Sequence, residues 1–429
     1  MCGYAACRRA AVQSRRDGVE ASGRRRGSSA QHRRAVLRQA APARCRWRDM
    51  NDSAGAVTVI VTKIATADEF AALRDPWRLL SEGREEISVF LSWEWQYYWW
   101  KHYGAGRELY LLAASEQGQL IGLLPLYKQQ APFGFGFRAT LLRMIGTGSD
   151  TTPDYLGCVA VGAREAQVLD ACLEYLAQHL DDWDATLFSD YLAASALGAR
   201  VPEWAGSLNL RSEEVDAQRI AYSELPGTWD AYLSSLTRGR RHKLRGIRRR
   251  FLALPQARLF VWQDLRDFDS AFDRLVALHR LRWKTRRRRH AFSSPEYIAF
   301  HRELARACMV NGWLRLYCMA VGDEIVAMLY CYLRNGTLYF FQSGFDPRYE
   351  DHSPGQCLMA FAIESAIGEN SQRIDMLRGD YQYKSAWAKD VRTTFRSIVY
   401  RNTPRARLHR LRHLVLPGIK RRVIAAFKR

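Results

Sequence analysis

The sequence has no hydrophobic run of about 18 residues, the length that a transmembrane helix needs. Its first residues also lack the continuous apolar segment of a secretory signal peptide. Although the chain contains nine cysteines, no two of them form a C-x-x-C pair, which disfavours a zinc ribbon and a thioredoxin-type motif. Scattered cysteines in apolar segments are typical of a reducing compartment, so we expect a cytoplasmic protein that holds no metal.

Acidic residues are missing from one end of the chain and scarce at the other. Residues 401–429 contain ten lysines and arginines and no acid, and residues 1–50 contain thirteen arginines, three acids and no lysine. The two ends therefore supply +20 of the net charge of +21, and the residues between them are nearly neutral. The basic composition says little about what this middle part binds.

Both ends are expected to lie outside the folded domains. Residues 1–56 are predicted to be a disordered basic segment, because they bury too little apolar surface to offset chain entropy. Either the true start lies near Met50, or the segment is a nucleic-acid-binding arm. In 401–429, Leu408, Leu411 and Leu414 recur at helical spacing among arginines, which predicts a basic amphipathic tail. Such a tail either rests on an anionic membrane surface or packs on the domain as a solvated helix.

The length of 429 residues and the hydrophobic content of 48% predict two domains with ordinary cores. Two stretches, 57–215 and 225–400, have a similar order of elements. In each, helical patterns precede a strand–turn–strand unit, at 108–128 and 313–333, which a further strand and a helix follow. We therefore predict an α/β (α+β) fold of two tandem domains, with mixed, largely antiparallel sheets flanked by helices.

A loop in the second stretch has the composition of a phosphate-binding site. After the predicted strand 337–345 and a short polar loop, Ser353, Pro354, Gly355 and Gln356 open the next helix. A helix N-terminus presents free N–H groups and a positive dipole end, and a glycine there lets a diphosphate approach the backbone. By itself, the same Pro-Gly pair also fits a plain helix cap.

A second polar cluster, at 375–387, follows a predicted strand that ends near Leu377. Asp380 and Lys384 are four residues apart, a spacing that puts two side chains on one helix face. A lysine beside an acid is suited to stabilising an oxyanion while the acid accepts a proton. The alternative is a surface salt bridge beside a packing pair of Tyr383 and Trp387.

The order of a strand, G-x-D-P (344–347), H-x-P-G (352–355), a helix, a strand and D-x-x-R-G-D-x-x-Y-K-x-x-W (375–387) resembles a branch of the GNAT acyltransferase superfamily. This branch is associated with cellulose and exopolysaccharide biosynthesis and is similar to the Fem-type peptidyltransferases. The resemblance covers about 57–400 and is most specific at 375–387. It implies two GNAT-like domains, with acetyl-CoA or another acyl-CoA as the donor. The first domain is expected to be degenerate and to help form the acceptor cleft.

The resemblance also implies roles for individual residues. The donor diphosphate would sit on Ser353, Pro354, Gly355 and Gln356, although the usual Gln/Arg-x-x-Gly-x-Gly/Ala loop is absent in that form. By analogy with a Fem-type lysine, Lys384 is the expected catalytic residue, with Asp380 and Asp375 as its partners. A backbone N–H near 342–344 is expected to bind the oxyanion. The expected substrate-binding residues are His279, Trp283, Arg378, Tyr383 and Trp387, although a lone His279 also fits a packed core.

Two basic clusters lie in the second stretch. Residues 238–250 hold eight lysines and arginines, and residues 280–289 hold seven. They fit a structural role near the cleft or the binding of an anionic acceptor, such as a nucleotide-linked sugar or a lipid phosphate. No RNA- or DNA-binding motif accompanies them, so nucleic acid is the least favoured partner.

These patterns predict a cytoplasmic acyltransferase, bound to the inner face of the membrane if its tail binds lipid. It would move an acyl group, most simply acetyl, from acyl-CoA to a hydroxyl or amine of a saccharide or lipid-linked precursor of a polysaccharide or the cell envelope. Two rivals remain. One is a Fem-type aminoacyl transferase that uses aminoacyl-tRNA, with 238–250 contacting RNA. The other is a non-catalytic subunit of a polysaccharide synthase.

Overall fold

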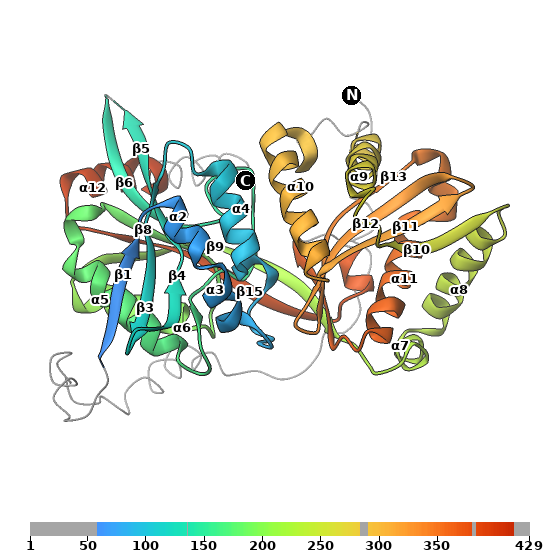
Figure 1. The fold of residues 1–429 in the computed structure, drawn as a ribbon, viewed down its shortest axis with the longest axis horizontal. Helices are drawn as coiled ribbons and strands as arrows, with labels where there is room; N and C mark the ends of the chain where they lie inside the picture. Colours follow the sequence, from blue (N-terminus) through green and yellow to red (C-terminus); the bar gives the residue numbers. More distant parts are fainter. Residues whose placement is uncertain (1–57, 135, 284–290, 380–382, 416–429) are drawn as a thin grey trace, which may run out of the picture. The chain divides into compact units, whose positions relative to one another are not determined.

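The computed structural model describes residues 58–134, 136–283, 291–379 and 383–415, which belong to one compact unit (Figure 1). The predicted disordered segment 1–56, Asp380 and the end of the tail lie outside these residues. The longer helices are α2 (Ala67–Ala72), α3 (Arg74–Ser81), α4 (Trp93–Tyr103), α5 (Glu165–Gln178), α6 (Ala196–Ser207), α7 (Trp229–Ser235), α8 (Arg238–Leu252), α9 (Phe268–Trp283), α10 (Pro295–Val310), α11 (Pro354–Gly368) and α12 (Pro404–Arg410).

The strands form one small and one large sheet. The small sheet has the order β1-β3-β4-β7, and the large sheet has the order β10-β11-β12-β13-β14-β9-β15-β8-β6-β5-β2. All neighbours are antiparallel except β13 with β14 and β6 with β8. The strands are β1 (Val59–Ile64), β2 (Glu108–Leu109), β3 (Leu111–Glu116), β4 (Gln119–Leu124), β5 (Leu126–Gly134), β6 (Phe137–Met144), β7 (Val159–Ala160), β8 (Ala185–Leu192), β9 (Arg211–Glu224), β10 (Ala257–Trp262), β11 (Leu314–Val321), β12 (Glu324–Arg334), β13 (Thr337–Phe345), β14 (Arg373–Arg378) and β15 (Asp390–Tyr400).

The same order of elements occurs twice along the chain. A hairpin (β3–β4 or β11–β12) precedes a parallel pair joined through a helix (β6–α5–β8 or β13–α11–β14), and a long strand (β9 or β15) ends each half. The second hairpin strands begin 205 residues apart, at Gln119 and Glu324, whereas the long strands begin 179 residues apart, at Arg211 and Asp390. The predicted fold class, with mixed and largely antiparallel sheets flanked by helices, is confirmed.

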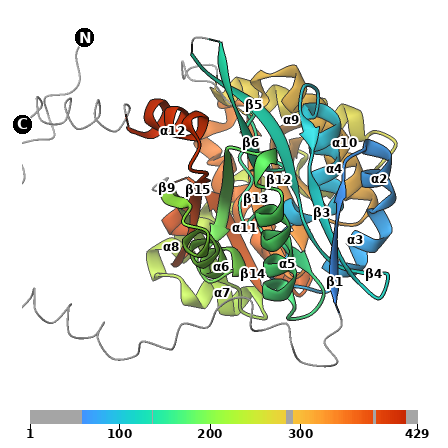
Figure 2. The same ribbon diagram turned by 90° about the vertical axis from the view of Figure 1, so that its left-hand side faces the viewer.

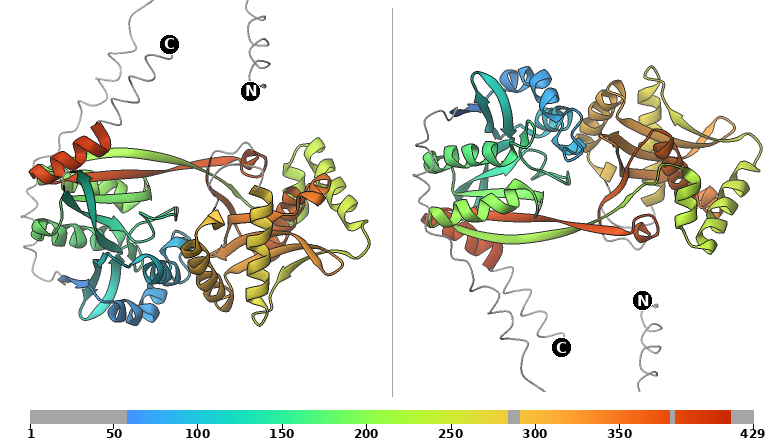
Figure 3. Two further views of the ribbon diagram at one scale, coloured as in Figure 1. Left: turned by 90° about the horizontal axis from the view of Figure 1, so that it is seen from above. Right: turned by 90° about the horizontal axis from the view of Figure 1, so that it is seen from below.

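The two long strands are exchanged between the halves. β9 lies between β14 and β15, and β15 lies between β9 and β8, so each half supplies the strand that pairs with the parallel strand of the other. Figure 3 shows β9 and β15 running side by side from one half to the other. Residues 216–224, which separate the two predicted domains, are thus part of β9. The domain bounds themselves stay a prediction.

The sheet of the second half is covered on both faces. On the hairpin β11–β12, Leu316 and Cys318 belong to the core that contains α9 and α10, whereas Tyr317 and Met319 belong to the core that contains α8 and α11. This alternation follows from the two-residue period of a strand. The continuous apolar run at 313–333 is therefore that of a strand buried on both faces.

Capping residues divide the helical patterns that precede the second hairpin into separate helices. The stretch 228–252 is two helices, because the Thr237 side chain accepts a hydrogen bond from the backbone N–H of Arg240 and starts α8. The stretch 267–310 is α9 and α10, and the Ser294 side chain caps α10 in the same way through Tyr297. The turns predicted within 108–128 and 313–333 are confirmed, with positive φ angles at Gln117, Gly118 and Gly322.

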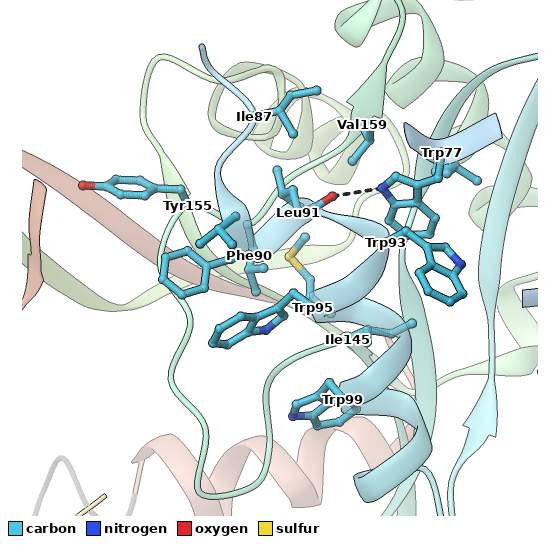
Figure 4. Close-up of a cluster of buried hydrophobic side chains, with 14 of the residues drawn as sticks. Trp77, Ile87, Phe90, Leu91, Trp93, Trp95, Trp99, Ile145, Tyr155 and Val159 are labelled. Carbon is cyan, nitrogen blue, oxygen red and sulfur yellow. Dashed lines mark hydrogen bonds between the residues drawn. The ribbon is translucent and has the colours of Figure 1, made fainter. Parts of the chain in front are cut away.

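The aromatic segment 92–103 forms α4 and the centre of the first core. Trp77, Trp95 and Trp99 are almost wholly buried, and the indole N–H of Trp77 donates to the carbonyl of Leu91 at 2.9 Å (Figure 4). Trp95 also meets Phe300 of α10 edge to face, with 5.3 Å between ring centroids. The core of the first half thereby extends into the second half.

Gly344 of β13 lies directly against the backbone of α9. A Cβ atom at this position would lie 2.2 Å from the backbone nitrogen of His279, so the strand and the helix approach more closely than any other residue allows. We expect Gly344→Ala to lower the free energy of unfolding by about 3 kcal/mol, as overpacking of a tight core does. Gly368→Ala is the control, because nothing lies within 4 Å of its Cβ position. Equal denaturant midpoints for the two variants would contradict this close packing.

Candidate functional site

A cavity of about 530 Å³ opens where the parallel strands β13 and β14 stop pairing. The two strands share only three residue pairs, the last being Tyr339 with Asp375. Beyond this point Phe340, Phe341, Gln342 and Ser343 line the cavity from β13, and Met376, Leu377, Arg378 and Gly379 line it from β14 and the residue that follows. A register shift in the pairing with β12 leaves Phe341 as an extra residue on β13. Such a bulge re-aims side chains beside a site.

Lys384 lies at the wall of this cavity and is only 5% exposed. Its ammonium nitrogen Nζ donates to the backbone carbonyls of Leu377, at 2.9 Å, and Arg378, at 2.5 Å. Burial lowers the pKa of Lys384 to about 8, although the negative charges of Asp154 and Asp375 act in the opposite direction. A buried lysine hydrogen-bonded to carbonyls differs from the exposed salt bridge that the sequence left as the alternative.

The backbone at Leu377 is bent so that β14 ends beside this lysine. Leu377 has φ +54°, a left-handed conformation that is rare and costly for a residue with a side chain. Its N–H donates to Asp375 Oδ1 at 2.8 Å, and the ladder with β9 is interrupted between Asp375 and Arg378. The carbonyls of Leu377 and Arg378, at this interruption of the ladder, accept hydrogen bonds from Lys384.

Arg378 holds the cavity wall against the first half of the chain. Its guanidinium forms ion pairs with Asp154 and Asp190, both at 2.7 Å, and its backbone N–H donates to Asp154 at 2.9 Å. Burial works to lower the pKa of Arg378, but the charges of the two aspartates outweigh it and hold the pKa above its ordinary value. Burial also raises the pKa of Asp154 to about 6. Asp154 lines the cavity together with Thr151 and Thr152.

Asp375 is fully buried behind the cavity wall and is not among the residues that line it. Its carboxylate forms an ion pair with Arg392 of β15 and accepts the hydroxyl of Tyr155 at 2.7 Å. Arg392 also donates to the Tyr155 oxygen, at 2.8 Å. The carboxylate thus ties β14, β15 and a loop of the first half together, and its part in catalysis stays a prediction.

The cavity brings together five of the predicted site residues: Lys384, Arg378, His279, Trp283 and Tyr383. His279 is buried on α9, and its ring lies 6.0 Å from that of Trp283 and 5.0 Å from that of Phe292. Tyr383 is 43% exposed. The roles that the resemblance implies for these residues remain predictions.

The other predicted residues lie elsewhere. The expected donor loop of Ser353, Pro354, Gly355 and Gln356 does not line the cavity, and neither does Trp387. Arg240 of α8 links these two places, because its guanidinium donates to Gln356 Oε1 at 3.1 Å and lies 4.5 Å from the Trp387 ring. Asp380 is outside the described residues, so its pairing with Lys384 stays a prediction.

Sequence reasoning missed several residues of the cavity. His301 of α10 is fully buried at its wall, and burial holds its pKa well below the ordinary value. Its ring lies 4.2 Å from that of Tyr297 and 4.9 Å from that of Phe341. A histidine on an amphipathic helix carries no sequence signal of such a position. Thr151, Thr152 and Asp154 carried a weak signal, because their segment occupies the place in the first half that the donor loop occupies in the second.

Two negative findings bear on other kinds of site. Within residues 58–134, 136–283, 291–379 and 383–415, no group of three or more His, Cys, Asp or Glu side chains is placed to hold a metal ion. No helix in the part of the chain that the structure describes is long and apolar enough to cross a bilayer.

Comparison with known proteins gives a family match for part of the chain and a similar fold for most of it. Residues 238–385 match the family model of the acetyltransferase (GNAT) domain, whereas comparison with curated proteins gave no match. The crystal structure of FemX is similar to this chain with a TM-score of 0.54 and 11% identity, over 80% of this chain and 97% of FemX. More distant are L-PGS from Bacillus licheniformis (TM-score 0.46, 11% identity, 79% of this chain and 96% of that one) and a tandem GNAT protein from the clavulanic acid biosynthesis pathway (0.42, 12%, 81% and 99%).

The match and the likeness to FemX bear on two predictions. The second half of the chain carries a GNAT-type acyltransferase domain, so the predicted enzyme class is confirmed. The matched residues include α8, the predicted donor loop and Lys384. The likeness to FemX supports the predicted fold over most of the chain. The assignment to the branch associated with cellulose and exopolysaccharide biosynthesis stays a prediction.

Removing the negative charge of Asp375 tests whether its carboxylate stabilises the fold or takes part in the reaction. Asp375→Asn leaves the Arg392 guanidinium without its buried counter-charge, so we expect the free energy of unfolding to fall by about 3 kcal/mol. Asp264→Asn is the control, because it breaks a solvent-exposed pair with Arg266 that contributes little to stability. Denaturant unfolding compares the two. Unchanged stability with lost turnover would instead place Asp375 in the chemistry.

Proposed function

We propose that the protein transfers an acyl group, most simply acetyl, from acyl-CoA to a hydroxyl or amine of a polysaccharide or cell-envelope precursor in the cytoplasm. The observation that carries this proposal is the buried ammonium of Lys384 at the wall of the cavity between β13 and β14. A fixed cation in a site of low water content stabilises developing negative charge far better than a solvated one. Such charge develops on the carbonyl oxygen of a thioester under attack.

The reaction that fits this site is direct transfer. The acceptor oxygen or nitrogen attacks the thioester carbonyl carbon, the new bond to that carbon forms, and the carbon–sulfur bond breaks. The acceptor loses a proton, and the departing CoA thiolate gains one. Lys384 and a backbone N–H near Gln342 and Ser343 would stabilise the oxyanion between these steps. With a pKa of about 8, Lys384 is mostly charged at neutral pH, as this role requires.

For the donor, we propose that the diphosphate of CoA lies at the N-terminus of α11. Ser353 caps this helix with φ +49°, and nothing lies within 4 Å of the place where a Gly355 Cβ would be, so the backbone there is open to a ligand. Arg240 adds a positive charge beside Gln356. The first turn of α11 holds no acidic residue that would repel a phosphate.

For the acceptor, we propose the cavity itself. Its walls carry the aromatic rings of Phe90, Trp95, Trp283, Tyr297, Phe340, Phe341 and Tyr383, and polar groups come from Thr151, Thr152, Gln218 and Gln342. Flat rings with a few directed polar groups suit a saccharide, which has both apolar ring faces and hydroxyl groups. The first half would thus contribute to the acceptor site through its loop at 151–154.

The cationic face of α8 favours a second candidate function. Its exposed residues include Arg238, Lys243, Arg245, Arg249 and Arg250, and none of them forms an ion pair with an acid in the described part of the chain. Together with the likeness to FemX, this supports an aminoacyl transferase whose donor is aminoacyl-tRNA and whose α8 contacts the phosphates of the RNA. Thermal shift with acetyl-CoA and with RNA separates the two candidates.

The Lys384 ammonium gives the sharpest test of the mechanism. We expect Lys384→Ala to lower kcat by about two to three orders of magnitude, the effect of removing one oxyanion donor, with little change in melting temperature. Lys384→Arg should rescue poorly, since a planar guanidinium does not replace a compact ammonium in a tight site. Because the folded-state pKa is about 8, the charged form is lost above that pH. The rate advantage of the wild type over Lys384→Ala should therefore decline as the pH rises past about 8. Near wild-type turnover of Lys384→Ala would remove Lys384 from the mechanism.

The donor site is tested at Gly355. The open surroundings of this residue predict that Gly355→Val folds normally, while its side chain enters the space proposed for the diphosphate. We expect the affinity for CoA, measured by calorimetry, to fall about ten-fold or more. Gly368→Val, at the other end of α11 and equally open, is the matched control. Unchanged CoA affinity in Gly355→Val would place the donor elsewhere.

A further inference from the structure

One end of the large sheet carries a surface that the proposed reaction does not use. It consists of the tip of the β5–β6 hairpin, the outer face of α12 and the short π-helical turn Leu411–Val415 that continues α12; we call it the α12 surface. Figure 2 shows α12 beside this hairpin, and α12 contacts β6.

Specific contacts hold the parts of the α12 surface together. The ring of Phe133, near the hairpin tip, stacks on Phe137 at 6.0 Å and meets His409 of α12 edge to face at 6.5 Å. Arg412 donates to the Phe133 carbonyl at 2.5 Å. His409 and Ala406 are buried and face the domain, so the opposite side of α12 faces outward. The helix is therefore docked on the hairpin.

Three large apolar side chains of the α12 surface are exposed in the part of the chain that the structure describes. Phe137 is 56% exposed, Leu408 48% and Leu411 45%. Single exposed apolar residues are ordinary, as with Leu79 and Val310 elsewhere on the chain, but these three lie on elements that contact one another. Leu408 and Leu411 are three residues apart and lie on the same side of the helix.

The same elements carry exposed arginines. Arg138, Arg405, Arg407 and Arg412 are exposed, and none of the four forms an ion pair in the described part of the chain. Residues 401–413 contain no acidic residue, although Arg401 and Arg410 pair with Asp181 and Glu213 of other elements. The outward charge of the α12 surface is therefore uncompensated.

We propose that the α12 surface docks on the anionic face of a lipid bilayer. Apolar side chains together with cations are the chemistry that an interfacial segment needs, because the apolar groups enter the acyl boundary while the cations meet lipid phosphates. A nucleic acid would be matched by charge alone, as on α8, and would leave Phe137, Leu408 and Leu411 in water. This proposal goes beyond the acyl-transfer function and does not depend on it, since none of these residues lines the cavity.

The test is co-sedimentation of the full-length protein with vesicles of phosphatidylcholine, with and without phosphatidylglycerol. We expect binding only to the anionic vesicles, weakening as salt rises because exposed charges are screened. Arg405→Gln with Arg407→Gln should weaken binding about five-fold for each charge removed. Phe137→Ser with Leu408→Ser should weaken it on the order of ten-fold. All four residues are exposed, so the melting temperature should not change.

Matched controls test whether vesicle binding depends on the α12 surface itself or on exposed apolar and charged residues anywhere on the protein. Leu79→Ser with Val310→Ser removes two exposed apolar side chains elsewhere, and Arg249→Gln with Arg250→Gln removes two exposed charges from α8; both should leave vesicle binding unchanged. The proposal is overturned if the α12 and control variants bind vesicles equally well. It is also overturned if the arginine pair on α12 loses affinity for a short RNA while its vesicle binding is intact.

Discussion

The pairing of β9 with β15 is the interaction on which the rest of the structure depends. Eleven residue pairs run along these two strands, each of which comes from a different half of the chain. The pair also carries side chains to the site. Arg392 of β15 reaches Asp375, Arg396 of β15 reaches Asp190, and Gln218 of β9 lines the cavity. The cavity wall is thus fixed by strands that neither half could supply alone.

The two halves start from one plan but differ where a ligand would enter. In the first half the parallel strands β6 and β8 also share only three residue pairs. Beyond them, the backbone N–H of Leu156 donates to the carbonyl of Asp190, so the chain's own loop occupies the place beside β8. The first turn of α5 holds Glu165, whose pKa burial raises, whereas the first turn of α11 has no acid. A carboxyl group at this position would repel the diphosphate of a donor bound to the first half. The loop beside β8 instead contacts the second half through Asp154, which pairs with Arg378, and Tyr155, which donates to Asp375.

The local sequence was sufficient to predict elements in which buried apolar residues follow a regular spacing. The hairpins at 108–128 and 313–333 and the strand 337–345 were all predicted, because apolar spacing determines them. β9 and β15 were not predicted. β9 is rich in charged residues, and the partners of both strands lie far along the chain, so no local pattern marks them. At the site, the motif around Lys384 gave Arg378, Tyr383 and Lys384, and the family resemblance added His279 and Trp283 of α9. His301 and Asp154 needed the three-dimensional arrangement of both halves.

The exchange of strands has a consequence for synthesis on the ribosome. When β14 is synthesised, its neighbour β9 has already been made. The edge of β8, in contrast, has no partner until β15, which ends at residue 400, has left the ribosome. During that time the first half exposes an unpaired edge, which is a site for wrong pairing with other chains. Contacts between residues about 200 positions apart also make folding slow, because the loop must close before the pairing stabilises it. The interval before β15 is made is thus the stage of synthesis at which the first half is most exposed to wrong pairing.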